Sequence, residues 1–416
     1  MNKDKRDSSI NIVFVSTLFI AAITSISIIF PAFILGTNED VPKYPEKIDI
    51  FEKGELFYQF LLVNMITISL AALHFKKKIP RVITNIFLKI TSYDISRKQA
   101  LVIMLILLDF YMVFTLQEVW MNDTWEDYNR IVKPRLQNFA FEDMIQPSGS
   151  TVSTLLGKIS MIVFGSYRVI PLVSSSILLF LTYFFTTIIT KKQIPGIIAV
   201  SIVLSSTIFL TYDTTITYPN FWIMFYLLSL IAVCRFWPLS PFLFVAAIMS
   251  KPLPILFLPI TFFFIYNSNI QQKKKIFISL SYVVLIAGIG LIYFLNNGIT
   301  TKYHLYHNIS HEFWSGFTTI VMQFRFEPLI TLFLIPVIIG LFVVSKKGIK
   351  NTKLVMFLIA WMLLLAPIIS GFTTYTNNTH RFIPLIIFFA IAVGVLFSTQ
   401  SIGRSTVQRM DAVSPG

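Results

Sequence analysis

The chain has 416 residues, of which 55% are hydrophobic and 13% charged, and its mean hydropathy of +0.73 excludes an ordinary soluble protein. Its net charge of +14 is explained by basic residues in the cytoplasmic loops of a membrane protein, so the charge gives no reason to expect a nucleic-acid partner. The single cysteine, Cys234, excludes a disulfide framework and a cysteine-based metal site.

Apolar runs of about 20 residues recur along the whole chain, and each is long enough to cross a hydrocarbon core of roughly 30 Å as a helix. We predict helices at residues 10–35, 56–75, 100–116, 169–190, 194–210, 221–236, 276–295, 329–344, 354–370 and 382–397. A broken apolar stretch at 238–266 predicts a shorter helical pair, hinged at Lys251 and Pro252. The sequence therefore predicts an all-α, polytopic membrane protein with about twelve transmembrane helices.

Basic residues are concentrated in every second connection between these runs, above all at 76–98 and 346–353. Because basic residues of short loops stay on the cytoplasmic side, we expect both termini in the cytoplasm and the connections 36–55, 121–153 and 296–327 on the outer side. The first apolar run lacks a cleavage pattern of small residues, so we interpret it as a retained helix. A composition rich in Lys and Ile, with one cysteine, indicates a prokaryotic plasma membrane.

The chain divides into three parts. Residues 1–99 form a leading transmembrane hairpin with a basic cytoplasmic segment, 100–398 form the main transmembrane body, and 399–416 form a polar cytoplasmic tail. The amphipathic pattern at 82–90 suits a helix on the membrane surface or, equally, a solvated basic loop. Asp109 lies inside an apolar run, where an ionisable residue suggests a functional role; we favour instead a hydrogen bond to a neighbouring helix.

The most informative segment is the polar connection that follows Trp120, because it gathers carboxylates between apolar runs. Its acidic residues are Asp123, Glu126, Asp127, Glu142 and Asp143. In one helical turn Asp123 and Asp127 would share a face, and carboxylates held so closely raise one pKa or attract a divalent metal ion. A hydroxyl or amide nucleophile needs a proton acceptor, so we predict Asp123, Glu126 and Asp127 as candidate general bases. The alternative is a merely solvated acidic loop.

Three histidines, His304, His307 and His311, recur in the connection 296–327 at a spacing that one helix would place on one face. This spacing suits metal ligands, but the aromatic residues around the histidines favour an interfacial or substrate-facing helix. We therefore predict no metal-binding residues in this connection. A divalent metal ion at the acidic loop stays open.

Short motifs follow one another in a fixed order on the expected outer side. They are Gln146-Pro-Ser-Gly149, Phe164-Gly165 with Arg168, Tyr212-Asp213, Met249-Ser-Lys251-Pro252 and His380-Arg381 with Pro384. With these motifs in this order, residues 101–397 resemble the GT-C membrane glycosyltransferases, especially the protein-mannosyltransferase and lipid A aminoarabinose-transferase branch.

The resemblance implies a GT-C-like fold in which residues 100–398 form the catalytic domain. It implies transfer of a sugar, with inversion, from a polyprenyl- or dolichyl-phosphate donor to a glycan, protein or lipid acceptor on the outer face of the membrane. A carboxylate among Asp123, Glu126 and Asp127 would act as base, and positive charge would hold the departing lipid phosphate. The expected substrate-binding residues are Asp143, Arg168, Lys251, Arg325, His380 and Arg381.

Two other classes of protein remain as alternatives. A transporter or lipid flippase would carry paired, similarly broken helices in two halves and charge at the membrane midplane, and the sequence offers only Asp109 and one broken pair. In a non-catalytic subunit of a membrane complex, the carboxylates would only organise the loop.

Overall fold

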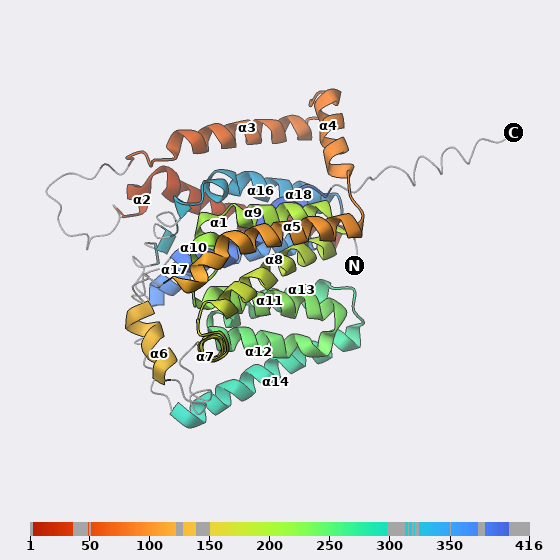
Figure 1. The fold of residues 1–416 in the computed structure, drawn as a ribbon. Coiled ribbons are helices and arrows are strands. Elements are labelled where there is room, and N and C mark those ends of the chain that lie inside the picture. Colours follow the sequence, from red (N-terminus) through yellow and green to blue (C-terminus); the bar gives the residue numbers. More distant parts are fainter. Residues whose placement is uncertain are drawn as a thin grey trace.

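The computed structural model describes residues 3–35, 49, 51–121, 128–138, 150–297, 313, 314, 316, 317, 320, 324–349, 351–372 and 379–398. Every regular element in these ranges is helical, which confirms the predicted all-α class. Most long helices lie side by side along one direction (Figure 1). The bundle therefore has two ends, which we call the terminus end, where α1 (Lys3–Ile29) begins, and the far end, where α1 stops.

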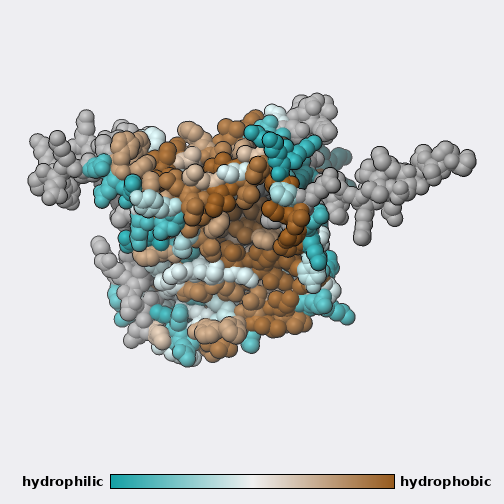
Figure 2. Space-filling model, turned by 90° about the horizontal axis from the view of Figure 1, so that it is seen from above, coloured by the Kyte–Doolittle hydropathy of each residue, from teal (hydrophilic) through white to brown (hydrophobic). Residues whose placement is uncertain are grey.

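By length and composition, eight of the described helices can cross a membrane. They are α1, α3 (Phe57–Phe75), α5 (Arg97–Thr115) with η1 (Leu116–Trp120), α8 (Val169–Thr190), α14 (Gln272–Asn297), α16 (Pro328–Lys346), α17 (Thr352–Phe372), and α18 (Ile383–Leu396) with η6 (Thr379–Phe382). The shorter elements are α2 (Pro31–Leu35), α4 (Arg81–Ser92), η2 (Tyr128–Val132), α6 (Lys133–Asn138), α7 (Thr151–Phe164), α9 (Ile194–Leu204), α10 (Thr207–Tyr212), α11 (Tyr218–Arg235), η4 (Trp237–Leu239), α12 (Ser240–Ser250), η5 (Leu253–Phe257) and α13 (Leu258–Asn267). Figure 2 shows a broad apolar surface with hydrophilic residues toward both ends, as expected of an integral membrane protein.

The eight long helices fall short of the predicted count of about twelve crossings. The difference arises in the middle of the chain, where the predicted run 221–236 forms α11, whose apolar part Pro219–Arg235 is just too short to count as a span, and the run 194–210 breaks into α9 and α10. The predicted broken pair at 238–266 forms α12, η5 and α13, none of which is long enough to count as a span.

The break between α9 and α10 is stabilised by a carboxylate from a distant part of the chain. Ser206 caps α10, because its Oγ accepts a hydrogen bond from the backbone N–H of Phe209 at 3.0 Å. Oε1 of Glu327 accepts from Ser206 Oγ and from the N–H of Ile208, both at 2.7 Å. A negative charge at a helix N-terminus is favourable, so Glu327 supports a new helix start where the apolar pattern alone predicts continuity.

The second break occurs where the sequence predicts it. Lys251 ends α12 in an extended conformation, with φ −163° and ψ 138°, and Pro252 begins the turn into η5. Proline has no N–H to donate and clashes with a continuing helix, which explains why the chain turns back at this point. Lys251 therefore stands between two short helices rather than inside a long one.

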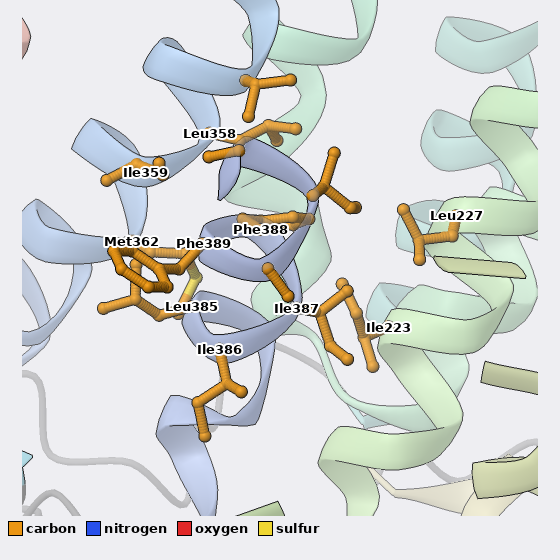
Figure 3. Packing of buried hydrophobic residues seen from close by; sticks show 14 of the residues in the cluster. Ile223, Leu227, Leu358, Ile359, Met362, Leu385, Ile386, Ile387, Phe388 and Phe389 are labelled. Atoms are coloured by element: carbon orange, nitrogen blue, oxygen red, sulfur yellow. The ribbon is translucent and has the colours of Figure 1, made fainter. Parts of the chain in front are cut away.

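The core of the bundle surrounds α18. Leu385, Ile387, Phe388 and Phe389 are each at most 1% exposed. In Figure 3, Phe389 and Leu385 lie beside Met362 of α17, while Ile387 points toward α11. Because α18 also packs closely on α9, α16 and α8, it fixes the positions of the helices whose far ends carry the polar residues described below.

Gly394 of α18 allows close packing against α9, and we expect Gly394→Ala to destabilise the protein. A Cβ at this position would lie 2.4 Å from the carbonyl oxygen of Pro195, a backbone atom that cannot rotate away. The expected loss is about 1–3 kcal/mol of unfolding free energy, measured by thermal unfolding in detergent. Gly290→Ala on α14 is the matched control, since a Cβ there meets nothing within 4 Å; equal melting temperatures for the two variants would contradict the packing argument.

At the terminus end, α4 runs across the direction of α3 (Figure 1). Val82, Ile86 and Ile90, spaced four residues apart, are exposed along α4. The turn after α4 is fixed to the body of the bundle, because Oδ1 of Asp94 accepts hydrogen bonds of 2.9 and 3.1 Å from two backbone N–H groups at the start of α9. The arrangement is the one expected of a helix that lies in the membrane plane at the interface.

Candidate functional site

A buried carboxyl group lies at the far end of the bundle, where Asp213 follows α10 and begins the connection to α11. Asp213 is 0% exposed, and within the described residues neither carboxyl oxygen has a hydrogen bond of acceptable geometry. The pKa of Asp213 is raised to about 7, mainly because the carboxyl group is buried; the facing Tyr111 hydroxyl works against this rise, and the nearby Glu118 carboxylate adds to it. This carboxyl group can therefore accept or release a proton near neutral pH.

Two helices hold the backbone at Asp213 in place. Ser175 of α8 donates from Oγ to the carbonyl oxygen of Asp213 at 2.7 Å, and Asn220 of α11 donates from Nδ2 to the carbonyl oxygen of Tyr212 at 2.9 Å. The Tyr111 hydroxyl of α5 and Oδ1 of Asn220 are also buried without a hydrogen-bond partner in the described part of the chain. Buried polar atoms left unsatisfied cost about 1–3 kcal/mol each, so such a group of them indicates a place for a polar ligand.

A second carboxylate, Glu118 of η1, lies beside this connection. Its Oε2 accepts a hydrogen bond of 3.0 Å from Oγ1 of Thr214, the residue after Asp213. Nη1 of Arg168 donates to the carbonyl oxygen of Glu118 at 2.9 Å, and Ser166 Oγ donates to that of Val119 at 2.8 Å. These contacts fix the end of η1, from which the acidic connection departs, directly against the segment that carries Asp213.

Basic side chains from three separate elements form a cluster at the same end: Lys251 at the break between α12 and η5, Arg381 of η6, and Arg135 of α6. Lys251 is half-buried. Burial, together with the positive charges of Arg381 and Arg135, lowers the pKa of Lys251 to about 8. Cations brought this close repel one another, so the fold creates a site whose electrostatics favour an anion.

The basic cluster and the buried carboxyl group are neighbours. His380, which precedes Arg381 and is 1% exposed, packs its ring edge-on against Tyr212, with the ring centroids 5.5 Å apart. Tyr212 directly precedes Asp213. The ring contact between His380 and Tyr212 therefore places the backbone of Arg381 near that of Asp213.

The helices α6 and α7 position Arg135 next to this junction. Nη1 of Arg135 donates to Ser150 Oγ at 3.1 Å, and Lys158 Nζ of α7 donates to the carbonyl oxygen of Leu136 at 2.9 Å. At Gly157 a Cβ would lie 1.8 Å from Cδ1 of Ile216, so the absence of a side chain lets α7 approach the connection 213–217. Leu136 and Ile216 share a small apolar cluster that supports this approach.

Several predicted site residues lie outside the described part of the chain. They are the candidate bases Asp123, Glu126 and Asp127, the predicted substrate residue Asp143, and the histidines His304, His307 and His311. The described ends of the acidic segment are nevertheless close to the site: η1 leads into it beside Thr214, and Tyr128, where the chain is described again, stacks on Tyr167 with ring centroids 4.8 Å apart.

The remaining predicted binding residues divide into two groups. Lys251, His380 and Arg381 lie close enough at the far end of the bundle to influence one another electrostatically. Arg168 is instead buried at 6% exposure, where it holds η1, and Arg325 is exposed with its guanidinium 4.6 Å from the centroid of the Phe326 ring. Their predicted role in phosphate binding stays a prediction.

Three contributors to the site were missed as such by sequence reasoning: Glu118, Arg135 and the Tyr111 hydroxyl. Asp213 was noticed only as part of a motif. A polar Asp-Thr-Thr run between two apolar segments was the one signal that could have singled out Asp213.

The chemistry open to this arrangement is proton transfer at Asp213 next to a site that favours an anion. Among the described residues, no three His, Cys, Asp or Glu side chains gather as ligands for a metal ion.

Comparisons of the chain with protein-family models, with curated proteins and with solved structures found no match.

Proposed function

We propose that this chain is a membrane glycosyltransferase of the GT-C type, which transfers a sugar from a polyprenyl-phosphate donor to an acceptor at the outer face of a plasma membrane. The observation that carries the proposal is the junction of the basic cluster with the buried carboxyl group of Asp213. The far end of the bundle is the outer side in this proposal, because the connections rich in Lys and Arg lie at the terminus end.

The basic cluster suits the donor phosphate. When the bond between the sugar carbon and the phosphate oxygen breaks, negative charge grows on the departing polyprenyl phosphate, and fixed cations stabilise that charge. Arg381 offers a planar fork of N–H donors that can bind two phosphate oxygens, and Lys251 adds a compact positive charge. The position of the cluster at the end of an apolar bundle matches a ligand with a polar head and a hydrocarbon tail.

The neighbouring carboxyl group suits the acceptor. As the acceptor oxygen or nitrogen bonds to the sugar carbon, its proton must leave, and the Asp213 carboxylate can take it because its pKa is about 7. Of the carboxyl groups that the structure describes, Asp213 is the best suited to this step. The loop carboxylates Asp123, Glu126 and Asp127 stay the predicted alternatives, on a segment attached beside Thr214.

The test is a transfer assay on the full chain in lipid nanodiscs. Polyprenyl-phosphate donors carrying different radiolabelled sugars are supplied together with glycan, peptide and lipid acceptors, and released polyprenyl phosphate is measured. We expect one donor to be cleaved, and cleavage to be lost in Lys251→Gln/Arg381→Gln. Movement of intact donor between leaflets without cleavage, in proteoliposomes, would instead identify a lipid flippase. Absence of both cleavage and movement for every donor would leave the subunit alternative.

A further inference from the structure

Asp109 presents a carboxyl group to the lipid-facing side of α5. It is exposed, and within the described residues it makes no hydrogen bond or ion pair, so the hydrogen bond to a neighbouring helix that we expected is not formed. The opposite face of α5 carries Ala100, Met104 and Tyr111, which are buried against the rest of the bundle. Asp109 therefore lies on the side of α5 that the fold leaves uncovered.

The position of Asp109 along the helix places it deep in the membrane. The apolar span runs from Arg97 to Trp120, and at a rise of about 1.5 Å per residue roughly 18 Å of helix separates Asp109 from Arg97. That distance puts the carboxyl group close to the midplane of a hydrocarbon core of about 30 Å. Snorkelling to the interface does not rescue a side chain as short as that of Asp.

The surroundings of Asp109 on this face are apolar and exposed. Val102, Ile106, Phe110 and Val113 are between 55% and 64% exposed. Three of them, Val102, Ile106 and Val113, form a stripe with Asp109 at positions 102, 106, 109 and 113, the spacing at which one helix packs along another. We call these residues the α5 stripe. Lipid can cover its apolar members, but it offers a carboxyl group no hydrogen-bond donor.

The cost of this arrangement points to an occupant. An ionisable residue at the centre of a membrane helix is energetically costly, and such residues normally face a partner. In the middle of the eight long described helices, Asp109 is the one acidic or basic residue. A second copy of this chain therefore brings no basic group of its own from those helices to the depth of Asp109.

We infer that the α5 stripe is the docking surface for a transmembrane helix of a different protein, one that carries a Lys or Arg at mid-depth. The basic side chain pairs with Asp109, and the partner's apolar residues cover Val102, Ile106 and Val113. Charge complementarity selects this occupant, since a purely apolar helix would leave the carboxyl group no better satisfied than lipid does. The inference is independent of the proposed function.

The experiment uses the full chain, labelled with a fluorophore at its N-terminus, in phosphatidylcholine vesicles. The probe is a synthetic transmembrane peptide of Leu and Ala with one central Lys and an acceptor dye, and the comparison peptide has Leu in place of that Lys. We expect energy transfer to show about tenfold tighter association with the Lys peptide, as one charged hydrogen bond in a membrane provides. Asp109→Leu should remove the difference, and this variant should still fold because it replaces a polar group that faces lipid by an apolar one.

A double variant tests whether the α5 stripe matters or any lipid-facing carboxylate suffices. Asp109→Leu/Val284→Asp moves the carboxylate to α14, where Val284 is 59% exposed near the middle of the helix. We expect little recovery of binding to the Lys peptide, and full recovery would overturn the assignment to α5. Equal affinity of the wild-type chain for both peptides would also overturn the inference. So would self-association of the chain, measured between differently labelled copies, if it depends on Asp109 and is not displaced by the Lys peptide.

Discussion

Replacing Asp213 by Asn is expected to reduce sugar transfer by about 10²–10⁴-fold, the usual contribution of a positioned general base. The change keeps the size of the side chain and removes only its capacity to take a proton. Transfer by the wild-type chain should rise with pH until the pH passes about 7, the pKa of Asp213, and then level off. The residual activity of Asp213→Asn should lack this rise. A wild-type profile in the same assay without any inflection near pH 7 would remove Asp213 as the base.

The same substitution should make the protein more stable above neutral pH. Burial raises the pKa of Asp213 from 3.8 to about 7, so below pH 4 the group is protonated in both the folded and unfolded states and costs nothing. As the pH rises from 4 to 7 the unfolded state loses the proton first, and above pH 7 the buried charge costs the folded state on the order of 4 kcal/mol. Thermal unfolding of Asp213→Asn and wild type should therefore diverge with rising pH, with the variant melting higher.

Glu327→Ala is the control for this effect. Glu327 is also a buried carboxylate, and burial raises its pKa, but its Oε1 accepts two hydrogen bonds that support the start of α10. Removing the whole carboxyl group leaves the Ser206 hydroxyl and the N–H of Ile208 without this acceptor, so the melting temperature should fall rather than rise. If both variants were destabilised alike, Asp213 would be a structural residue, and the proposed base would have to come from the acidic loop.

Arg381→Ala is expected to lower kcat/KM for cleavage of the sugar donor by about 10²–10³-fold. Losing one charged hydrogen-bond donor to the developing negative charge has an effect of this size in other enzymes. Arg381→Lys should recover only part of the loss, because an ammonium group does not reproduce the guanidinium fork. The measurement is donor cleavage at varied donor concentration. Arg235→Ala is the control, since this exposed arginine stands at the terminus end of α11 with its guanidinium 5.7 Å from the centroid of the Phe184 ring. Equal losses in both variants would mean that general surface charge, not the basic cluster, attracts the donor.

Sequence reasoning reached the features of this fold that depend on local chemistry. Hydrophobic run length located the helices, and proline chemistry located the break at Lys251. Lys251 and Arg381 were expected to act together because a lipid phosphate needs positive charge. In the structure the charge of Arg381 lowers the pKa of Lys251, so the two residues lie near each other.

The features that sequence reasoning missed depend on residues far apart in the chain. The predicted helix 194–210 breaks because Glu327 supports a cap at Ser206, 121 residues earlier. The burial of Asp213 requires Tyr111 and Asn220 from two other helices, and neither apolar periodicity nor a motif carries that information. Whether a polar residue next to a helix end is solvated or enclosed is decided by tertiary packing alone.

The helix α1 packs against helices that lie more than 300 residues later in the chain. Thr17 of α1 donates from Oγ1 to the carbonyl oxygen of Met356 at 3.4 Å, across 339 residues of sequence, and α3 similarly reaches Leu332 of α16 through Asn64. At about 5–20 residues per second, a ribosome needs on the order of 20–70 s to add that length of chain. During this interval α1 must stand in the bilayer without its partners.

Two polar side chains of these helices also have hydrogen-bond acceptors within their own helix. Thr17 Oγ1 also donates to the carbonyl oxygen of Val13 at 2.7 Å, and Nδ2 of Asn64 donates to that of Phe60 at 2.8 Å, both within their own helices. A polar donor that has an acceptor within its own helix costs less in lipid before the helix finds its neighbours. Biogenesis of this protein can therefore proceed with its first and third helices inserted early and the bundle closed only when α16 and α17 arrive.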